Sequence, residues 1–244
     1  MIPDVESWPR ISVVTPCYQA ATCLEATISS VLNQGYPNLE YYVVDGGSED
    51  GTVEILKHYE HRLSGWISEA DDGMYDALNK GFSRCTGEVM CWLNADDLMC
   101  PDALSLVGQL FAQMENIEWV LGMPCFFDGG GRLAHVSAEI PKWSVYRFLM
   151  GDYKWIQQEG TFWRRSLWEK AGNRMNAGYR YAGDLELWTR FFAHAQLYSL
   201  SVPLGGMRVR GKGQLSHDFW PQYRDECEHA ISAMRKSTDT EILR

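Results

Sequence analysis

Asn94-Ala95-Asp96-Asp97 follows directly on the apolar run 89–93. Two adjacent carboxylates at the end of a buried strand repel each other unless a cation or solvent screens them. Mn²⁺ or Mg²⁺ suits such a place, because these ions prefer oxygen ligands and often keep only one or two protein carboxylates. A solvated turn that caps the next helix also fits these residues. Their position at a strand end favours the metal.

Asp45 ends another apolar run and precedes the glycine-rich loop 46–51. Its carboxylate can accept hydrogen bonds from the imide of a uracil or from ribose hydroxyls, although a helix-capping turn explains the loop as well. The sequence contains no GxxxxGK[ST] motif, and no GxGxxG follows its first apolar run. These absences argue against nucleotide hydrolases and dinucleotide-dependent dehydrogenases.

The segment 68–81 combines acidic residues with a helical pattern. Asp76 and Lys80 are four residues apart and can pair across one helical turn. That pairing leaves out Asp71, which precedes the helix and is therefore a candidate for holding a ribose or sugar hydroxyl.

Apolar runs predict the buried strands that must position these side chains, and residues at helical spacing predict helices between them. Four such strands within about the first 110 residues indicate a mostly parallel, doubly wound α/β sheet. Ligands of such sheets bind beyond the carboxyl ends of the strands, so the polar clusters should meet at one edge. The predicted strands are 11–15, 41–44, 66–67 and 89–93; later elements are a turn at 129–131, a strand or loop at 157–164, and helices at 184–193 and 217–236.

Four segments carry a resemblance to a known family: ISVVTPCYQ, VVDGGSEDGT, SEADDGMYDALNKG and WLNADD. In this order and spacing they resemble the nucleotide-binding half of family 2 glycosyltransferases with the GT-A fold. The bacterial branch that builds O-antigens and exopolysaccharides is the most similar. The resemblance is close over about the first 110 residues and covers only patches beyond them.

The resemblance implies a single GT-A domain over residues 1–244. Its nucleotide-sugar half would span about 10–115, and its acceptor half with the C-terminal helix about 116–244. It implies that Asp96, with Asp97, holds Mn²⁺ or Mg²⁺, and Asn94 stands where the family has an aspartate. The residues it assigns to the donor are Thr15, Pro16, Tyr18, Asp45, Asp71, Asn79, Lys80, Asn94 and Ala95.

Family 2 enzymes invert the anomeric centre in a single displacement, which requires a base for the acceptor hydroxyl. Asp184 in YAGDLELWTR is similar to the aspartate that serves as this base, although Gly183 replaces the acid that precedes it. Without the resemblance, the pattern favours Asp184 as a helix cap and Glu186 as a partner of Arg190.

Gln158, Glu159 and Trp163 resemble the acceptor-proximal segment of the family. Gln158 or Glu159 could hold sugar hydroxyls, and Trp163 could be either a sugar-stacking platform or part of the core. The later segment RVRGKGQLSH contains Arg208, Arg210 and Lys212. It is either a flap that closes on the diphosphate or a solvated loop.

The chain of 244 residues has 22 basic and 32 acidic side chains, a formal charge of −10 that opposes binding to nucleic acid. No apolar run approaches the ~18 residues of a membrane span, and the first residues lack a signal-peptide pattern, so we expect a cytoplasmic protein. Peripheral contact with the inner face of the cell membrane through Trp143, Tyr146 and Phe148 stays open. Seven cysteines without a CxxC pair should be reduced and buried.

We therefore expect an inverting, metal-dependent glycosyltransferase that uses a nucleoside diphosphate sugar, UDP-linked, and a glycan or lipid-linked acceptor in surface polysaccharide synthesis. The alternative, motivated by Asn94 and Gly183, is a catalytically silent nucleotide-sugar-binding or scaffold protein of the same fold. A nucleotidyltransferase would bring a glycine-rich loop with a basic residue, which 11–19 lacks. The donor sugar, the acceptor, the linkage and the oligomeric state do not follow from the sequence.

Overall fold

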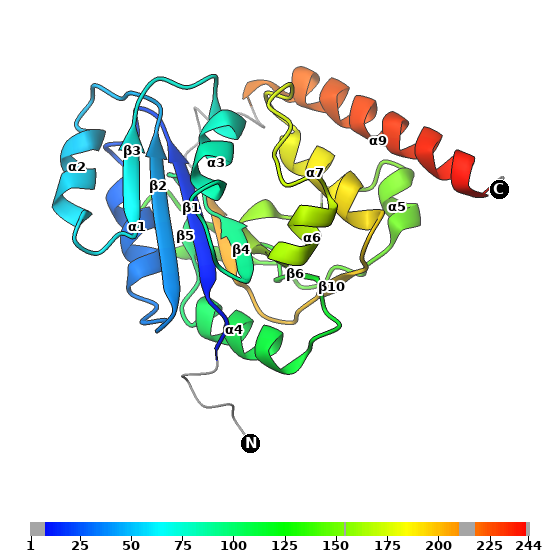
Figure 1. Ribbon diagram of the computed structural model, residues 1–244, viewed down its shortest axis with the longest axis horizontal. Helices are drawn as coiled ribbons and strands as arrows, with labels where there is room; N and C mark the ends of the chain where they lie inside the picture. Colours follow the sequence, from blue (N-terminus) through cyan, green and yellow to red (C-terminus); the bar gives the residue numbers. More distant parts are fainter. Residues whose placement is uncertain (1–7, 154, 210–217, 243–244) are drawn as a thin grey trace.

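The computed structural model describes residues 8–153, 155–209 and 218–242. Its centre is a twisted sheet flanked by helices (Figure 1). The seven strands lie in the order β10-β6-β9-β4-β1-β2-β3. All neighbouring strands are parallel, except that β9 runs antiparallel to both β4 and β6. The strands are β1 (Ile11–Cys17), β2 (Leu39–Asp45), β3 (Gly65–Ser68), β4 (Val89–Trp92), β6 (Trp119–Leu121), β9 (Thr161–Arg164) and β10 (Leu197–Ser199).

The four strands predicted in the first half are present, and so is the mostly parallel sheet. The segment 157–164 divides into the 3-10 turn Gln158–Gly160 (η2) and strand β9. A second, four-stranded sheet has the order β5-β11-β7-β8. It places β11 beside β5, the strand that follows Asp97 directly. Its strands are β5 (Leu98–Met99), β7 (Cys125–Phe127), β8 (Leu133–Val136) and β11 (Gly205–Arg208).

The helices follow the apolar spacing of the sequence, and each buries its apolar side against the rest of the protein. The C-terminal helix lies across the acceptor half and contacts α7 and α5 (Figure 1). It begins at Trp220, and His217, where the sequence predicted its start, lies outside the described residues. The helices are α1 (Leu24–Leu32), α2 (Thr52–Tyr59), α3 (Met74–Phe82), α4 (Ala103–Gln113), α5 (Val145–Leu149), α6 (Arg165–Lys170), α7 (Gly183–Phe192) and α9 (Trp220–Ile242).

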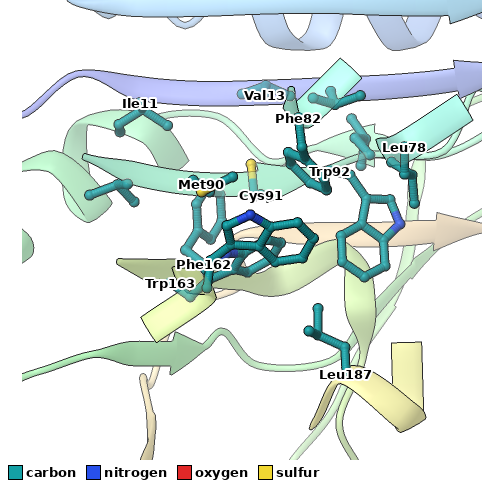
Figure 2. Packing of buried hydrophobic residues seen from close by; sticks show 14 of the residues in the cluster. Ile11, Val13, Leu78, Phe82, Met90, Cys91, Trp92, Phe162, Trp163 and Leu187 are labelled. Atoms are coloured by element: carbon teal, nitrogen blue, oxygen red, sulfur yellow. The ribbon is translucent and has the colours of Figure 1, made fainter. Parts of the chain in front are cut away.

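A cluster of three tryptophans joins the two halves of the chain. Trp92 of β4 stacks on Trp188 of α7 with ring centroids 5.8 Å apart. Trp163 of β9 meets Trp92 edge-on at 5.6 Å and Trp188 at 6.0 Å. None of the three is more than 1% exposed. Figure 2 shows Trp92 and Trp163 among the aliphatic residues of the sheet.

The burial of Trp163 corrects one expectation from the sequence. A residue that stacks on an acceptor sugar must reach the surface, whereas Trp163 is 0% exposed and pairs through its strand with Met90 and Trp119. Trp163 therefore belongs to the core. It faces the interior because β9 inserts between β4 and β6 as a central strand of the sheet.

Only one of the three aromatic residues considered for peripheral membrane contact is exposed. Tyr146 is 77% exposed, but Phe148 is fully buried and Trp143 is half-buried. Within the described ranges, no helix has the length and apolar character needed to cross a membrane. All seven cysteines are free and buried, which confirms the prediction of reduced thiols.

Because Trp163 packs against five other aromatic side chains in the core, we predict that Trp163→Ala lowers the free energy of unfolding by about 3–5 kcal/mol. Trp163→Phe keeps an aromatic ring and should cost less. Urea denaturation followed by circular dichroism measures both. A loss below about 1 kcal/mol for the alanine variant would contradict this placement of Trp163.

Candidate active site

The carboxyl ends of β1, β2 and β3 meet at one edge of the sheet. Cys17 lies opposite Asp45, and Asp45 lies opposite Ser68. The loops that follow these strands touch each other, because a Cβ atom at Gly46 would come within 2.8 Å of Asp71 Oδ2. The candidate donor residues thus gather at the edge where ligands of such sheets bind.

The buried Asp45 carboxylate supports this edge through hydrogen bonds. It is completely buried, its Oδ2 accepts hydrogen bonds from the Ser48 amide at 3.0 Å and the Ser68 hydroxyl at 2.7 Å, and its Oδ1 accepts one from the Ser48 hydroxyl. Asp45 therefore holds the glycine-rich loop in place, and its contact with a nucleoside stays a prediction.

The other residues assigned to the donor differ in how far their side chains are exposed. Thr15 is buried with its hydroxyl 2.9 Å from the Tyr41 hydroxyl, and Pro16 is buried in β1, so neither side chain reaches the surface. Tyr18 is 66% exposed directly after β1. Asp71 is half-buried, accepts a hydrogen bond from the Gly73 amide at 2.8 Å, and has a raised pKa because of its burial.

The loop 94–97 is tied down from α1. The Thr27 hydroxyl is 2.7 Å from the Ala95 carbonyl and 2.8 Å from the Asp97 carbonyl. The Asn94 amide nitrogen donates to Asp97 Oδ2 at 3.1 Å and to Gln158 Oε1 at 3.3 Å. Its oxygen, Oδ1, is buried and has no hydrogen-bond partner in the described part of the chain. The loop thus presents a partly exposed carboxylate at Asp96 and an unused amide oxygen at Asn94.

Asp97 and Glu159 form a buried carboxyl pair behind this loop. Asp97 is 2% exposed and Glu159 is 9% exposed. Asp97 Oδ1 accepts the Arg208 amide at 3.0 Å, and the two acids share a hydrogen bond. Burial and mutual repulsion hold the pKa of Asp97 well above its usual range, and burial raises the pKa of Glu159 to about 7.

Two other residues singled out by the sequence are hydrogen-bonded within the protein. Asp97 uses one oxygen for the Asn94 amide group and the other for the Arg208 amide. Gln158 is 7% exposed and donates to the Trp92 carbonyl at 2.7 Å, so it anchors the end of β4. The metal role of Asp97 and the acceptor roles of Gln158 and Glu159 stay predictions.

Asn79 and Lys80 are also used within the protein. The Asn79 amide group donates to the Met175 carbonyl at 3.1 Å and accepts from the Met175 amide at 2.7 Å. Lys80 lies 3.0 Å from Glu69 and 3.2 Å from Asp76, the second contact being the helical pair expected from the spacing. The Asn79 side chain thus clamps the loop that leads to α7, and its donor role stays a prediction.

Asp184 is the second residue of α7. Its Oδ1 is buried and has no hydrogen-bond partner among the described residues. Burial raises the pKa of Asp184 to about 6. Asp184 and Asp96 both act electrostatically on Glu159, so the loop 94–97 and the start of α7 approach the same place. The arrangement suits a general base beside a site for a charged ligand.

The sequence did not reveal the residues that orient Asp184. The Tyr75 hydroxyl accepts a hydrogen bond from the Gly183 amide at 2.8 Å, and a Cβ atom at Gly183 would lie only 2.6 Å from the Tyr75 ring. Glu226 of α9 approaches the same helix start. Tyr75 stood inside a recognised motif, but nothing in the sequence connects it to residue 183, and Glu226 carried no signal.

The predicted basic flap is described only at its beginning. Arg208 ends β11 and is 5% exposed. Arg210, Lys212 and His217 lie outside the described residues. In the described ranges, no three His, Cys, Asp or Glu side chains are grouped as metal ligands. Asp96 and the Asn94 amide oxygen are nevertheless of the oxygen type that Mn²⁺ and Mg²⁺ prefer.

The raised pKa values of Asp97 and Glu159 predict a pH-dependent stability. The folded protein keeps protons that the unfolded chain releases above its ordinary glutamate pKa of 4.5, so the free energy of unfolding falls as the pH rises to about 7. The Glu159→Gln variant lacks one titrating group. Between pH 5 and pH 7.5 its free energy of unfolding should therefore fall by about 2 kcal/mol less than that of the unmodified protein.

Urea denaturation at both pH values, with a chelator present, measures this difference. Glu169→Gln, which changes an exposed glutamate on α6, is the matched control and should behave like the unmodified protein. Equal pH dependence in the Glu159→Gln variant and in this control would contradict the shared-proton description.

The family model "Glycosyl transferase family 2" matches residues 12–179. An uncharacterized glycosyltransferase of Mycobacterium tuberculosis is 32% identical over 188 residues, which cover 75% of this chain and 69% of that protein. TuaG of Bacillus subtilis, named as a teichuronic acid biosynthesis glycosyltransferase, is 33% identical over 126 residues. That match covers 50% of this chain and less than half, 46%, of TuaG.

Among solved structures, S. aureus TarS residues 1–349 has the same fold, with a TM-score of 0.72 and 18% identity. The superposition covers 92% of this chain and 66% of that fragment. The fold is therefore that of the GT-A glycosyltransferases. Since the family model covers more than half of the sequence, including the carboxyl ends of β1, β2, β3 and β4, the chain belongs to glycosyl transferase family 2.

Proposed function

We propose that this protein is an inverting glycosyltransferase that transfers a sugar from a UDP-sugar to a hydroxyl group of a glycan or lipid-linked acceptor in surface polysaccharide synthesis. The observation that carries the proposal is Asp184, a carboxylate with a raised pKa and a buried, unused oxygen at the start of α7. It lies on the acceptor side of the edge formed by the strand ends.

The choice of donor is supported by the fold and by the exposed residues at that edge. S. aureus TarS, which shares the fold, has been crystallised with UDP and with UDP-GlcNAc. In this chain Tyr18 offers an exposed aromatic ring, and Asp71 offers a partly exposed carboxylate for ribose hydroxyls. The names of TuaG and of EpsE from Bacillus subtilis, which is 28% identical over 197 residues, support glycosyl transfer in a surface-polymer pathway.

A divalent cation fits the loop 94–97 through Asp96 and the amide oxygen of Asn94. Few protein ligands are needed, because Mg²⁺ and Mn²⁺ complete their coordination with water and with the phosphates of a ligand. When bound, the ion would stabilise the negative charge of the departing diphosphate. Asp97 supports this loop through its hydrogen bonds with Asn94 and Arg208.

Asp184 would perform the proton transfer. As the acceptor oxygen attacks the anomeric carbon, the Asp184 carboxylate takes the proton of that hydroxyl, and the bond between the sugar and the diphosphate breaks with its electron pair leaving on UDP. A pKa of about 6 suits this role, because the group is ionised at neutral pH yet more basic than an ordinary aspartate. A single displacement of this kind inverts the anomeric centre.

We predict that Asp184→Asn lowers kcat by about 10³-fold or more while the Kd for the UDP-sugar stays unchanged, because the variant loses the base but keeps the donor edge. A turnover assay over a panel of UDP-sugars, paired with calorimetry, measures the two quantities. Sugar transfer at an undiminished rate in the Asp184→Asn protein would rule out its role as the base.

We predict that Asp96→Ala abolishes Mn²⁺-dependent binding of UDP and sugar transfer without lowering the melting temperature, because Asp96 lies in a surface loop held by other residues. Asp72→Ala, which removes an exposed carboxylate from the same edge, is the control and should bind UDP normally. Calorimetry with UDP in the presence and absence of Mn²⁺ distinguishes them. UDP binding without transfer or donor hydrolysis for any sugar tested would instead support a silent binding protein.

A further inference from the structure

The start of α7 lacks a cap of its own. Its N-cap residue, Ala182, has no side chain that could accept a hydrogen bond, and the first amide groups of a helix have no partner within the helix. The Glu226 carboxylate of α9 binds the three residues that lead into this helix. It accepts hydrogen bonds from the amides of Arg180 at 2.9 Å, Tyr181 at 2.8 Å and Ala182 at 2.8 Å.

Residue 183 cannot provide an acid at this position. Any side chain there would overlap the Tyr75 ring, which lies 2.6 Å from where its Cβ would be. The acidic residue that precedes the base in the family pattern is therefore excluded by packing. Glu226 brings a carboxylate to the same helix start from more than 40 residues further along the chain.

We propose that Glu226 is the positioning residue of the base: it fixes residues 180–182, which lead into α7, and thereby Asp184, and it supplies the negative charge that the glycine at position 183 cannot. This inference rests on the proposed function, in which Asp184 takes the proton of the acceptor. It assigns the C-terminal helix a direct part in forming the site.

The charges around Asp184 single out Glu226. Tyr223 and Cys227 approach from α9 and Tyr75 from α3, but burial raises the pKa of all three, that of Cys227 to about 12, so they are neutral near pH 7. Glu159 approaches from η2 with a pKa of about 7. Glu226 contributes repulsion that favours the protonated form of Asp184.

Other contacts of α9 fix the position of Glu226 relative to the start of α7. The Tyr179 hydroxyl lies 2.8 Å from His229 Nδ1, one helical turn beyond Glu226. The buried side of α9 carries Cys227, Ala230 and Ile231. Figure 1 shows α9 lying over α7 along this contact. The segment 179–182 is thus fastened to α9 at two points.

The test compares Glu226→Gln, Glu226→Asp and the control Glu228→Gln in the full chain. Glu228 is exposed on the same helix and lies 3.8 Å from Arg224, so its neutralisation leaves the start of α7 untouched. The measurements are kcat against pH, the Kd for UDP, and amide hydrogen exchange of residues 180–182. Circular dichroism confirms that each variant is folded.

For Glu226→Gln we expect kcat to fall about tenfold or more with an unchanged Kd for UDP, and the acidic limb of the kcat profile to move to lower pH. The amides of 180–182 should exchange faster. Glu226→Asp keeps the negative charge on a shorter side chain. Its kcat should therefore fall, while the acidic limb of its kcat profile stays nearer to that of the unmodified protein. Activity, pH profile and exchange in Glu226→Gln equal to those of Glu228→Gln would overturn the inference.

Failure of the proposed function is recognised separately. If the unmodified protein transfers no sugar, or Asp184→Asn remains active, Asp184 is not the base and the proposed function falls. The exchange rates still decide whether Glu226 holds the start of α7. Unchanged exchange in Glu226→Gln would refute that positioning whatever the activity.

Discussion

The stacking of Trp92 on Trp188 is the constraint on which the site depends. Trp92 ends β4, two residues before Asn94, and Trp188 lies one helical turn after Asp184. Because both rings are buried against Trp163, β4 and α7 cannot shift relative to each other without opening the core. The core therefore fixes the distance between the loop 94–97 and the Asp184 carboxylate.

The acidic residues around this core divide into two groups. Asp45, Asp97 and Glu159 are buried, and hydrogen bonds or a shared proton compensate for their lost hydration. They give the loops their shape. Asp96 and Asp71 remain partly exposed at the edge of the sheet, where they can meet a cation or a nucleoside. Of these five acidic residues, three shape the loops and two remain accessible to a ligand.

The strands, and the edge at which they end, could be predicted because apolar runs and the rules of parallel sheets are local properties. Gln158 and Trp163 could not be placed, since the sequence does not show that the strand after Gly160 enters the sheet antiparallel between β4 and β6. Once it does, its side chains point into the core or toward the back of the 94–97 loop. Glu226 escaped prediction because a cap that reaches across more than 40 residues leaves no periodic trace.

The most direct test of the account is the anomalous difference map of crystals soaked with Mn²⁺ and a UDP-sugar. We expect a manganese peak beside Asp96, with the diphosphate bound to the ion, the nucleoside near Tyr18 and Asp71, and the anomeric carbon facing Asp184. A nucleotide bound elsewhere, or Asp96 directed away from an empty edge, would contradict the account.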